Sequence, residues 1–167
     1  IDRTGRLWVA LNGGGVALFL DEKQSSNGQT KKFASYFLSY DRQPNNVSRI
    51  LFDEQNHMWC ATEAGIFRAR SSEPSNLEFE FVTDTPDIAS REALIDRQQR
   101  LWFGFSGAVV RIEENNTIRF DLDPGQDITG IAQTDDGALY ASTARKLYRF
   151  NESQQTWMTV DVNLHSK

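Results

Sequence analysis

The chain has 167 residues, of which 39% are hydrophobic and 25% are charged, and it carries a formal net charge of −5. This composition is typical of a soluble globular protein that can bury a core, and it excludes a disordered chain. The basic residues are scattered except at Lys31-Lys32 and Arg145-Lys146, and no apolar run approaches the ~20 residues of a membrane-spanning helix. We therefore expect no binding to nucleic acid, which requires a clustered basic face, and no membrane insertion by this segment.

One pattern recurs four times along the chain: a polar turn, a large apolar residue and then an aromatic residue. The aromatic residues follow one another at intervals of roughly 40 to 50 residues, which is typical of a repeat architecture. We call these four residues the aromatic column: Trp8, Trp59, Trp102 and Tyr140. The turns before them supply the other positions that define the repeat, which are Asp2, Gly5, Asp53, Asp96 and Gly137.

The segments around each turn alternate in hydrophobicity with period two, so they predict β-strands rather than helices. Four short antiparallel strands, A to D, are expected in each copy. In the second copy they are expected at 47–53, 57–62, 65–70 and 77–83. In the turn before the aromatic residue, Asp closes the turn with its side chain and Gly supplies a positive φ. Asn56 is the next-best residue for that conformation, whereas Gln99 is not, so the third copy departs from the residue pattern.

Repeated four-stranded units of this length are typical of the blades of a β-propeller. The fold class predicted is therefore all-β, with the whole chain, 1–167, forming a single partial propeller of about three and three-quarter blades. The blades are expected at 1–40 (strands B to D only), 47–83, 89–122 and 128–162. The polar stretch 21–30 lengthens the C–D connection of the first blade. Propellers usually close with four to eight blades, so we expect a piece of a larger propeller, an assembly of copies, or an unusually small propeller. The start within a blade favours the first.

The first two copies carry a resemblance to a known family. With Asp2-Arg-Thr-Gly5-Arg-Leu-Trp8-Val-Ala, and with the run from Val47 to Arg68, the chain resembles the two-component regulator propeller repeat. That repeat consists of Asp, two residues, Gly, a polar residue, Leu-Trp, a small apolar pair, Thr, a Gly turn and an apolar-x-Arg strand. The resemblance covers all four copies, and the fourth departs from it because Tyr140 replaces Trp and Thr134 stands in place of Asp.

This resemblance implies a bacterial signalling protein. Propellers with this repeat form the periplasmic sensing part of membrane proteins, commonly hybrid histidine kinases and sometimes diguanylate cyclases, and many respond to products of polysaccharide breakdown. It implies that the chain is a non-catalytic sensor segment outside the cytoplasm. Such a segment binds a polar small molecule, with an oligosaccharide as one candidate, or relays a signal to a kinase or cyclase module outside this chain.

The fourth copy, Ile131-Ala-Gln-Thr-Asp-Asp-Gly137-Ala-Leu-Tyr140, is also similar to repeats of streptogramin lyase. That seven-bladed enzyme uses a catalytic His and acidic residues with magnesium. The histidines here are His57, in the turn before Trp59, and His165, in the C-terminal tail. We interpret His57 as an exposed turn residue, and we assign no catalytic residue, metal site or cofactor to the chain.

Two isolated residues deserve comparison with known nucleophiles. Cys60 is the single cysteine, and a lone thiol is usually a small buried hydrophobe. Ser106 lies in Gly104-Phe-Ser106-Gly107, which lacks the strand-to-helix setting of a nucleophile elbow and fits a turn between strands. The acidic stretch 121–127 lacks the closing Glu of a calcium loop, so we expect an ordinary Pro-Gly turn there.

The better candidates come from topology. In a propeller the D–A and B–C connections lie on one face around the central channel, where ligands usually bind. Hydrogen-bonding side chains in these connections suit a sugar or another polar ligand, although Asp, Asn and Pro are also what any turn uses. The candidate ligand-binding residues are Arg42, Asn45, Asn46, Glu63, Asp84, Asp87, Arg91, Gln126, Asp127 and Arg145.

Three classes of function follow from these observations. A sensor propeller predicts stabilisation by polar small ligands. A scaffold for protein contacts predicts a large apolar patch on an exposed blade edge or face. A lyase or hydrolase predicts a convergent acid, base or metal site. If the chain is natively this short, its terminal blades would expose sheet edges, and an isolated fragment is therefore expected to dimerise or aggregate.

Overall fold

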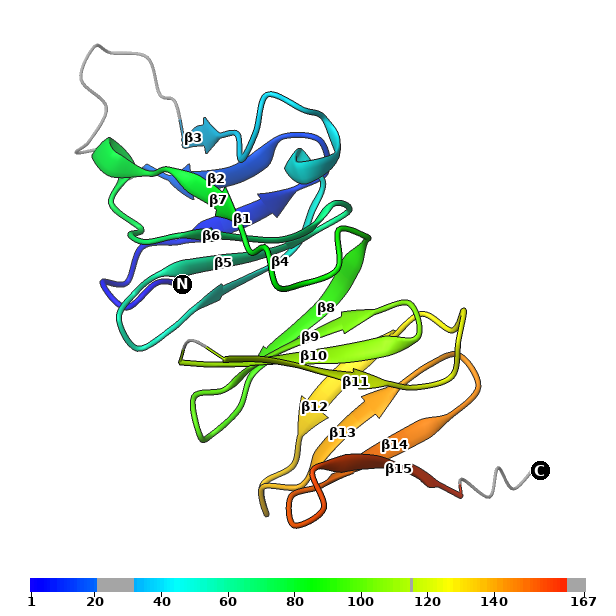
Figure 1. Cartoon of the computed structure of the whole chain (residues 1–167). Helices are drawn as coiled ribbons and strands as arrows, with labels where there is room; N and C mark the ends of the chain where they lie inside the picture. The colour runs from blue at the N-terminus through cyan, green and yellow to red at the C-terminus, as the bar shows by residue number, and fades with distance from the viewer. Residues whose placement is uncertain (21–31, 115, 162–167) are drawn as a thin grey trace, which may run out of the picture. The chain divides into compact units, whose positions relative to one another are not determined.

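The computed structural model describes residues 1–20, 32–114 and 116–161. Within these residues the chain forms four antiparallel sheets, one of three strands and three of four strands, in which neighbouring strands follow one another in sequence (Figure 1). The other regular elements are short 3-10 helices, among them η2 (Gln43–Asn45) and η3 (Pro74–Asn76). The prediction of an all-β propeller fold with incomplete fourfold repetition is confirmed.

Each sheet is one blade, and we number the blades in chain order. Blade 1 contains β1 (Trp8–Leu11), β2 (Gly15–Phe19) and β3 (Phe33–Tyr36). Blade 2 contains β4 (Val47–Phe52), β5 (Met58–Thr62), β6 (Gly65–Ala69) and β7 (Phe79–Phe81). Blade 3 contains β8 (Ser90–Ile95), β9 (Leu101–Phe105), β10 (Ala108–Glu113) and β11 (Asn116–Asp121). Blade 4 contains β12 (Gly130–Gln133), β13 (Leu139–Ser142), β14 (Leu147–Asn151) and β15 (Thr156–Val160).

The strands of blade 2 lie within two residues of their predicted bounds at every end. The polar stretch 21–30, predicted to be a long surface connection, lies outside the described residues, as does His165. No helix among the described residues is long and apolar enough to cross a membrane.

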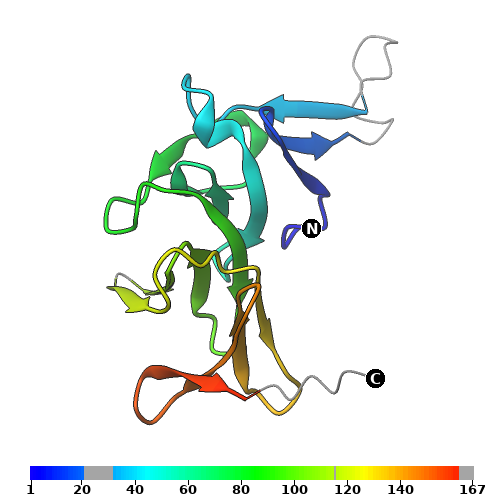
Figure 2. The ribbon, with the colours of Figure 1, turned by 90° about the vertical axis from the view of Figure 1, so that its right-hand side faces the viewer.

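The chain divides into two compact units, residues 1–90 and residues 91–167, each of which holds two blades. Figure 2 shows the two sheets of unit 1 from a second side, with the blue strands of blade 1 separate from the cyan and green strands of blade 2. In unit 1, β1 lies next to β4, and in unit 2, β9 lies next to β12. In both units, therefore, strand B of one blade packs against strand A of the following blade.

The core of each unit lies between its two sheets, and a residue of the aromatic column is at its centre. Trp8 packs with Met58, Phe67 and Ala69 of blade 2. Trp102 is fully buried, and its ring lies 5.0 Å from that of Phe150 and 5.7 Å from that of Trp157, both in blade 4. An aromatic side chain of this size buries about 150–250 Å², so the predicted role of the aromatic column between sheets is borne out in both units.

The turn before each aromatic residue has the same backbone conformation in all four blades. The third residue after the Asp or Thr has a positive φ: 87° at Gly5, 64° at Asn56, 62° at Gln99 and 89° at Gly137. The third copy thus departs from the pattern in residue type but not in backbone conformation. Gln99 adopts the left-handed conformation because the hydrogen bonds of Asp96 hold the turn closed around it, at a cost that a glycine would not carry.

Candidate functional site

Unit 1 builds a polar cluster where the connection from blade 1 to blade 2 meets the B–C turns. The Asn46 side chain donates a hydrogen bond from Nδ2 to Glu63 Oε2 at 2.8 Å, and the Glu63 backbone N–H donates to the Asn46 carbonyl at 3.2 Å. Asn12, in the B–C turn of blade 1, forms an isolated bridge with Asn46. The structure thus brings together two of the predicted residues, Asn46 and Glu63, and adds Asn12.

The neighbouring residue, Asn45, serves the loop itself. Its buried side chain accepts a hydrogen bond from the Leu38 N–H at 2.7 Å and donates to the carbonyls of Ser39 at 2.8 Å and Asp41 at 2.7 Å. These bonds use both the donor and the acceptor of the amide, so Asn45 positions the connection and holds Asn46 beside Glu63.

Three other candidates of unit 1 lie on the connections without joining this cluster. Arg42 and Asp84 are exposed, Arg42 at the start of η2 and Asp84 after β7. Asp87 is also exposed, and it follows Pro86, whose carbonyl oxygen would lie 2.7 Å from a Cβ placed at Gly65. The connection after β7 therefore lies directly over the B–C turn of blade 2.

Unit 2 builds the corresponding cluster where the connection from blade 3 to blade 4 meets the B–C turns. The Lys146 ammonium lies 2.5 Å from the Asp123 carboxylate. This ion pair lowers the pKa of Asp123 and raises the pKa of Lys146, so both groups stay charged across the neutral range. Sequence analysis singled out Arg145 instead, which is exposed in the same turn. Residue type alone could not predict which of these two neighbouring basic residues pairs with Asp123.

The remaining candidates of unit 2 are placed at the neighbouring turn. The Gly107 N–H donates to the Gln126 carbonyl at 2.9 Å, and Asp127 forms an isolated bridge with Ser106. Gln126 and Asp127 therefore lie against the B–C turn of blade 3. Arg91 is exposed at the start of β8.

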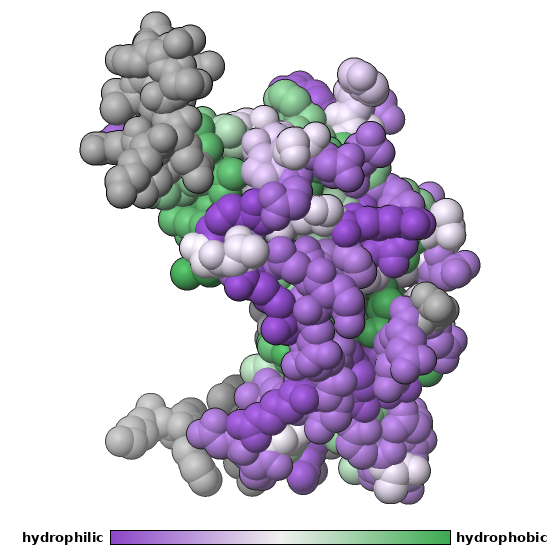
Figure 3. Space-filling view, turned by 90° about the vertical axis from the view of Figure 1, so that its left-hand side faces the viewer, coloured by the Kyte–Doolittle hydropathy of each residue, from purple (hydrophilic) through white to green (hydrophobic). Residues whose placement is uncertain are grey.

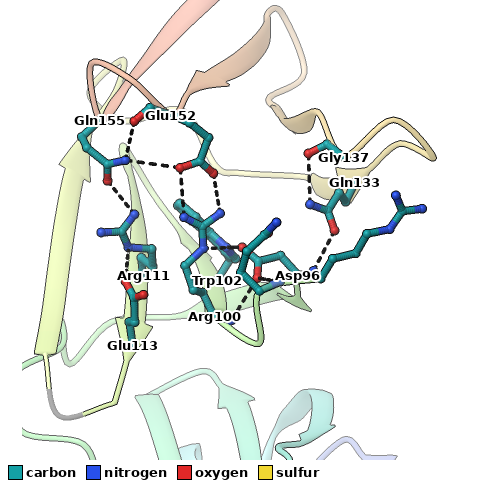
Figure 4. Close-up of polar contacts among 11 residues, drawn as sticks. Asp96, Arg100, Trp102, Arg111, Glu113, Gln133, Gly137, Glu152 and Gln155 are labelled. Carbon is teal, nitrogen blue, oxygen red and sulfur yellow. Dashed lines mark hydrogen bonds and ion pairs between the residues drawn. The ribbon is translucent and has the colours of Figure 1, made fainter.

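A second polar feature, which sequence analysis did not find, joins the two blades of each unit. In unit 2 the buried Arg100 donates from Nε to Asp96 Oδ2 at 2.6 Å and from its terminal nitrogens to the carboxylate of Glu152 in the C–D turn of blade 4 (Figure 4). Arg111 donates to Gln155 of the same turn at 2.7 Å. We call this arrangement the inter-blade polar cluster. It consists of the Asp, the basic residue four positions later and the C–D turn of the next blade.

Unit 1 repeats the cluster with other residues. Arg6 bonds Asp2 Oδ2 at 2.7 Å, Ser72 at 2.8 Å and Glu73 at 3.0 Å, the last two in the C–D connection of blade 2. Although burial by itself raises the pKa of Asp2, hydrogen bonds from the amide and guanidinium of Arg6, with others from Thr4 and Trp8, hold that pKa well below its usual range.

Blades 2 and 4 have other residues at the position of Arg6 and Arg100. In blade 2 it is His57, whose Nδ1 lies 2.9 Å from Asp53 Oδ2, so His57 is a partly buried turn residue and not an exposed one. In blade 4 it is Ala138, and Thr134 replaces the Asp. The Asp carboxylate of the other three blades also accepts from the indole N–H of the aromatic column: Trp8 at 3.1 Å, Trp59 at 2.9 Å and Trp102 at 2.7 Å.

Cys60 and Ser106, which were compared above with known nucleophiles, lie in the core and in a turn. Cys60 is fully buried, and desolvation raises the pKa of its thiol, as expected for a small core residue. Ser106 lies in a B–C turn between two strands. Among the described residues, no three His, Cys, Asp or Glu side chains form a group that could hold a metal ion.

Comparison with known proteins identifies relatives by fold. No family model matches the chain, and no curated protein matches it in sequence. It is similar to the extracellular domain of a hybrid two-component system, BT4673, from B. thetaiotaomicron, over 96% of its residues, with 18% identity and a TM-score of 0.73. It is similar to the corresponding domain of a second system, BT3049, from the same organism, over 92% of its residues, with 21% identity and a TM-score of 0.68.

A third similarity is to virginiamycin B lyase from Staphylococcus aureus, over 99% of the chain, with 17% identity and a TM-score of 0.74. The chain spans 21% of the length of each of the two extracellular domains and 55% of the lyase. Both of the predicted likenesses, to two-component sensor propellers and to a lyase-type propeller, are therefore present at the level of structure, and the fold they share with this chain is the β-propeller.

Proposed function

We propose that the chain is a non-catalytic segment of a sensor propeller that lies outside the cytoplasm, and that it binds a polar ligand and relays its presence to a signalling module elsewhere. The observation that carries the proposal is the pair of polar clusters at equivalent loops, Asn46 with Glu63 in unit 1 and Asp123 with Lys146 in unit 2. The two extracellular domains of similar fold belong to two-component systems, which supports the same interpretation.

The chemistry of these clusters favours a hydroxylated ligand. A carboxylate accepts hydrogen bonds from hydroxyl groups, whereas an amide and an ammonium group donate them, so each cluster offers both kinds of partner. Hydrogen bonds hold the backbone at each cluster. In unit 1 they come from Asn45, and in unit 2 the Gln126 N–H donates to the Asp123 carbonyl while the Lys146 N–H donates to the Thr143 hydroxyl. A fixed cluster loses little conformational entropy when a ligand binds. An oligosaccharide fits this description.

A lyase function has less support. The one histidine among the described residues, His57, is paired with Asp53 inside a turn that recurs in blades 1 and 3 with Arg in place of His. A residue that takes the place of a structural arginine is best explained by its role in the turn.

The test is a thermal-unfolding screen of the chain against neutral and acidic oligosaccharides. We expect a rise in Tm with at least one class of sugar, and loss of that rise in the Asn46→Ala/Glu63→Ala variant or the Asp123→Ala/Lys146→Ala variant. The matched control is Asp135→Asn, an exposed carboxylate in an A–B turn, which should keep the full response. If every sugar left Tm unchanged, or if both cluster variants kept the response, the proposal would be wrong.

A further inference from the structure

Blade 4 contains a buried hydroxyl group that the fold leaves without a partner. Tyr148 of β14 is 3% exposed and is paired with Ala141, which packs in one core cluster with Trp102 of blade 3. The tyrosine ring therefore lies inside unit 2, between its two blades. Among the described residues, no group is placed to form a hydrogen bond with the Tyr148 hydroxyl. A buried hydroxyl without a hydrogen bond lowers the stability of a protein, so packing alone does not explain it.

Unit 1 shows that the hydroxyl is not needed to fill this space. Phe67 has the same register position in blade 2, since it is paired with Cys60, the residue after the aromatic column, as Tyr148 is paired with Ala141. Phe67 is 9% exposed and packs in the core with Trp8. A phenylalanine ring thus suffices between blades 1 and 2. The oxygen of Tyr148 therefore has a role other than packing.

The hydroxyl lies beneath the ion pair of Asp123 and Lys146. Burial raises the pKa of Tyr148, and the Asp123 carboxylate raises it further, which shows that the two groups are close together. The side chains of Asp123 and Lys146 are 39% and 44% exposed, whereas Tyr148 is buried. Asp123 therefore has an ammonium group on its exposed side and an unused hydrogen-bond donor on its buried side.

Positive charge exceeds negative charge around the B–C turn of blade 4. Arg145 is exposed next to Lys146, and its guanidinium makes no hydrogen bond or ion pair with the described residues. Asp123 pairs with Lys146, whereas Asp127 lies at Ser106 in the turn of blade 3. Most of the surface in Figure 3 is hydrophilic, so polarity alone does not mark a site. Two cations beside one carboxylate, above an unused buried donor, are a more specific arrangement.

We propose that the unit 2 cluster binds the carboxylate of an acidic oligosaccharide, with Arg145 and Lys146 as its cationic partners and Tyr148 as a positioning residue. In the free chain Lys146 is held by Asp123. When the ligand carboxylate accepts hydrogen bonds from Lys146, the Tyr148 hydroxyl donates to Asp123 in place of the ammonium group. The charge of Asp123 thus keeps a partner, and the ligand gains charge-assisted hydrogen bonds. This inference rests on the proposed function and names the class of sugar for one of its clusters.

The test compares two oligosaccharides of equal length, one of galacturonate and one of galactose, by isothermal titration calorimetry at fixed pH and ionic strength. We expect the wild-type chain to bind the acidic sugar more tightly than the neutral one. Arg145→Gln and Tyr148→Phe should each weaken binding of the acidic sugar by about tenfold, which is typical for the loss of a hydrogen bond to a charged group. Both variants should bind the neutral sugar as the wild-type chain does.

The Tm without sugar separates a role in binding from a role in the fold. Tyr148→Phe should keep or raise this Tm, because the hydroxyl has no hydrogen bond in the free chain. The matched controls are Tyr36→Phe in β3 and Arg70→Gln, at an arginine of blade 2 whose side chain is 77% exposed. Neither control should change the affinity for either sugar.

The inference is overturned if the wild-type chain shows no preference for the acidic sugar, if Tyr148→Phe keeps the full affinity for it, or if Tyr148→Phe lowers the Tm of the free chain. It is also overturned if a control variant loses the same affinity. A neutral sugar bound as tightly as the acidic one would leave the proposed function standing while this inference fails. A wild-type chain that bound no sugar of either class would contradict both.

Discussion

At the scale of single residues, one carboxylate organises each turn of the repeat. In blade 1, Asp2 accepts hydrogen bonds from the backbone of Thr4 and Arg6, from the Arg6 guanidinium and from the Trp8 indole. The same group therefore closes the turn and fixes the aromatic side chain that fills the space between two sheets. This explains why Asp and Trp recur together six residues apart in three of the four copies.

Replacing Asp2 by Asn should lower the free energy of unfolding by about 2 kcal/mol at neutral pH, because the amide nitrogen cannot accept from Arg6 Nε and Trp8 Nε1. The pKa of Asp2 is depressed in the folded chain. Its contribution is therefore complete above the unfolded-state pKa of about 3.9 and is lost as the pH falls towards the folded value. Urea unfolding at neutral and acid pH measures both effects.

In that experiment the Asn variant should lose stability in acid less steeply than the wild-type chain. Asp84→Asn, at an exposed carboxylate, is the control and should change neither the stability nor its pH dependence. Equal acid slopes for the wild-type chain and the Asp2→Asn variant would show that the charge of Asp2 is not what the turn requires.

Gln99 adopts a backbone conformation that its residue type disfavours. It has a φ of 62° in a conformation that costs an L-residue with a Cβ about 1–2 kcal/mol. Gln99→Gly should therefore raise the free energy of unfolding by about 1 kcal/mol, less than the full strain because glycine also gains freedom in the unfolded chain. Asn56→Gly, at the same position of blade 2, should give a smaller gain since Asn tolerates this conformation. A loss of stability in Gln99→Gly would contradict the explanation.

At the scale of strands and blades, the period-two patterns and the turn residues were enough to predict the strands of blade 2 to within two residues. These patterns are formed by residues close together in the sequence, so they can be read from one sequence alone. The inter-blade polar cluster was not predicted, because Arg100 and Glu152 are 52 residues apart and only the packing of one blade on the next brings them together. The same holds for Lys146 and Asp123, whose pairing depends on two connections from different blades.

The bond between Arg100 and Glu152 should stabilise the contact of blade 3 with blade 4. A double-mutant cycle with Arg100→Met and Glu152→Gln is expected to give a coupling energy of about 1 kcal/mol, at the upper end for a partly exposed pair, because both terminal nitrogens of the guanidinium are engaged. The control cycle uses Arg119 and Asp121, a pair on the surface of blade 3 that should couple by only about 0.3 kcal/mol. Equal coupling in the two cycles would show that the inter-blade contact adds nothing.

At the scale of the whole molecule, the two units repeat one plan. Each has two blades with a tryptophan between them, a polar cluster that joins the first blade to the C–D turn of the second, and a polar cluster at the connecting loops. The fold class and the number of blades could be predicted from the sequence, since repetition itself is visible there. The proposed ligand-binding residues could be predicted only as positions in loops, because turn-forming and ligand-binding residues are of the same types.

The proposed ligand site at the connecting loops is tested most directly by an NMR titration of the isotope-labelled chain with the sugar that raises Tm. The account predicts that the amide signals of Asn46, Glu63, Asp123 and Lys146, and of their neighbours in the two sets of connections, shift together and saturate. Signals that shift only elsewhere, such as in β15 of blade 4, or no saturable shifts at all, would contradict a ligand site at these clusters.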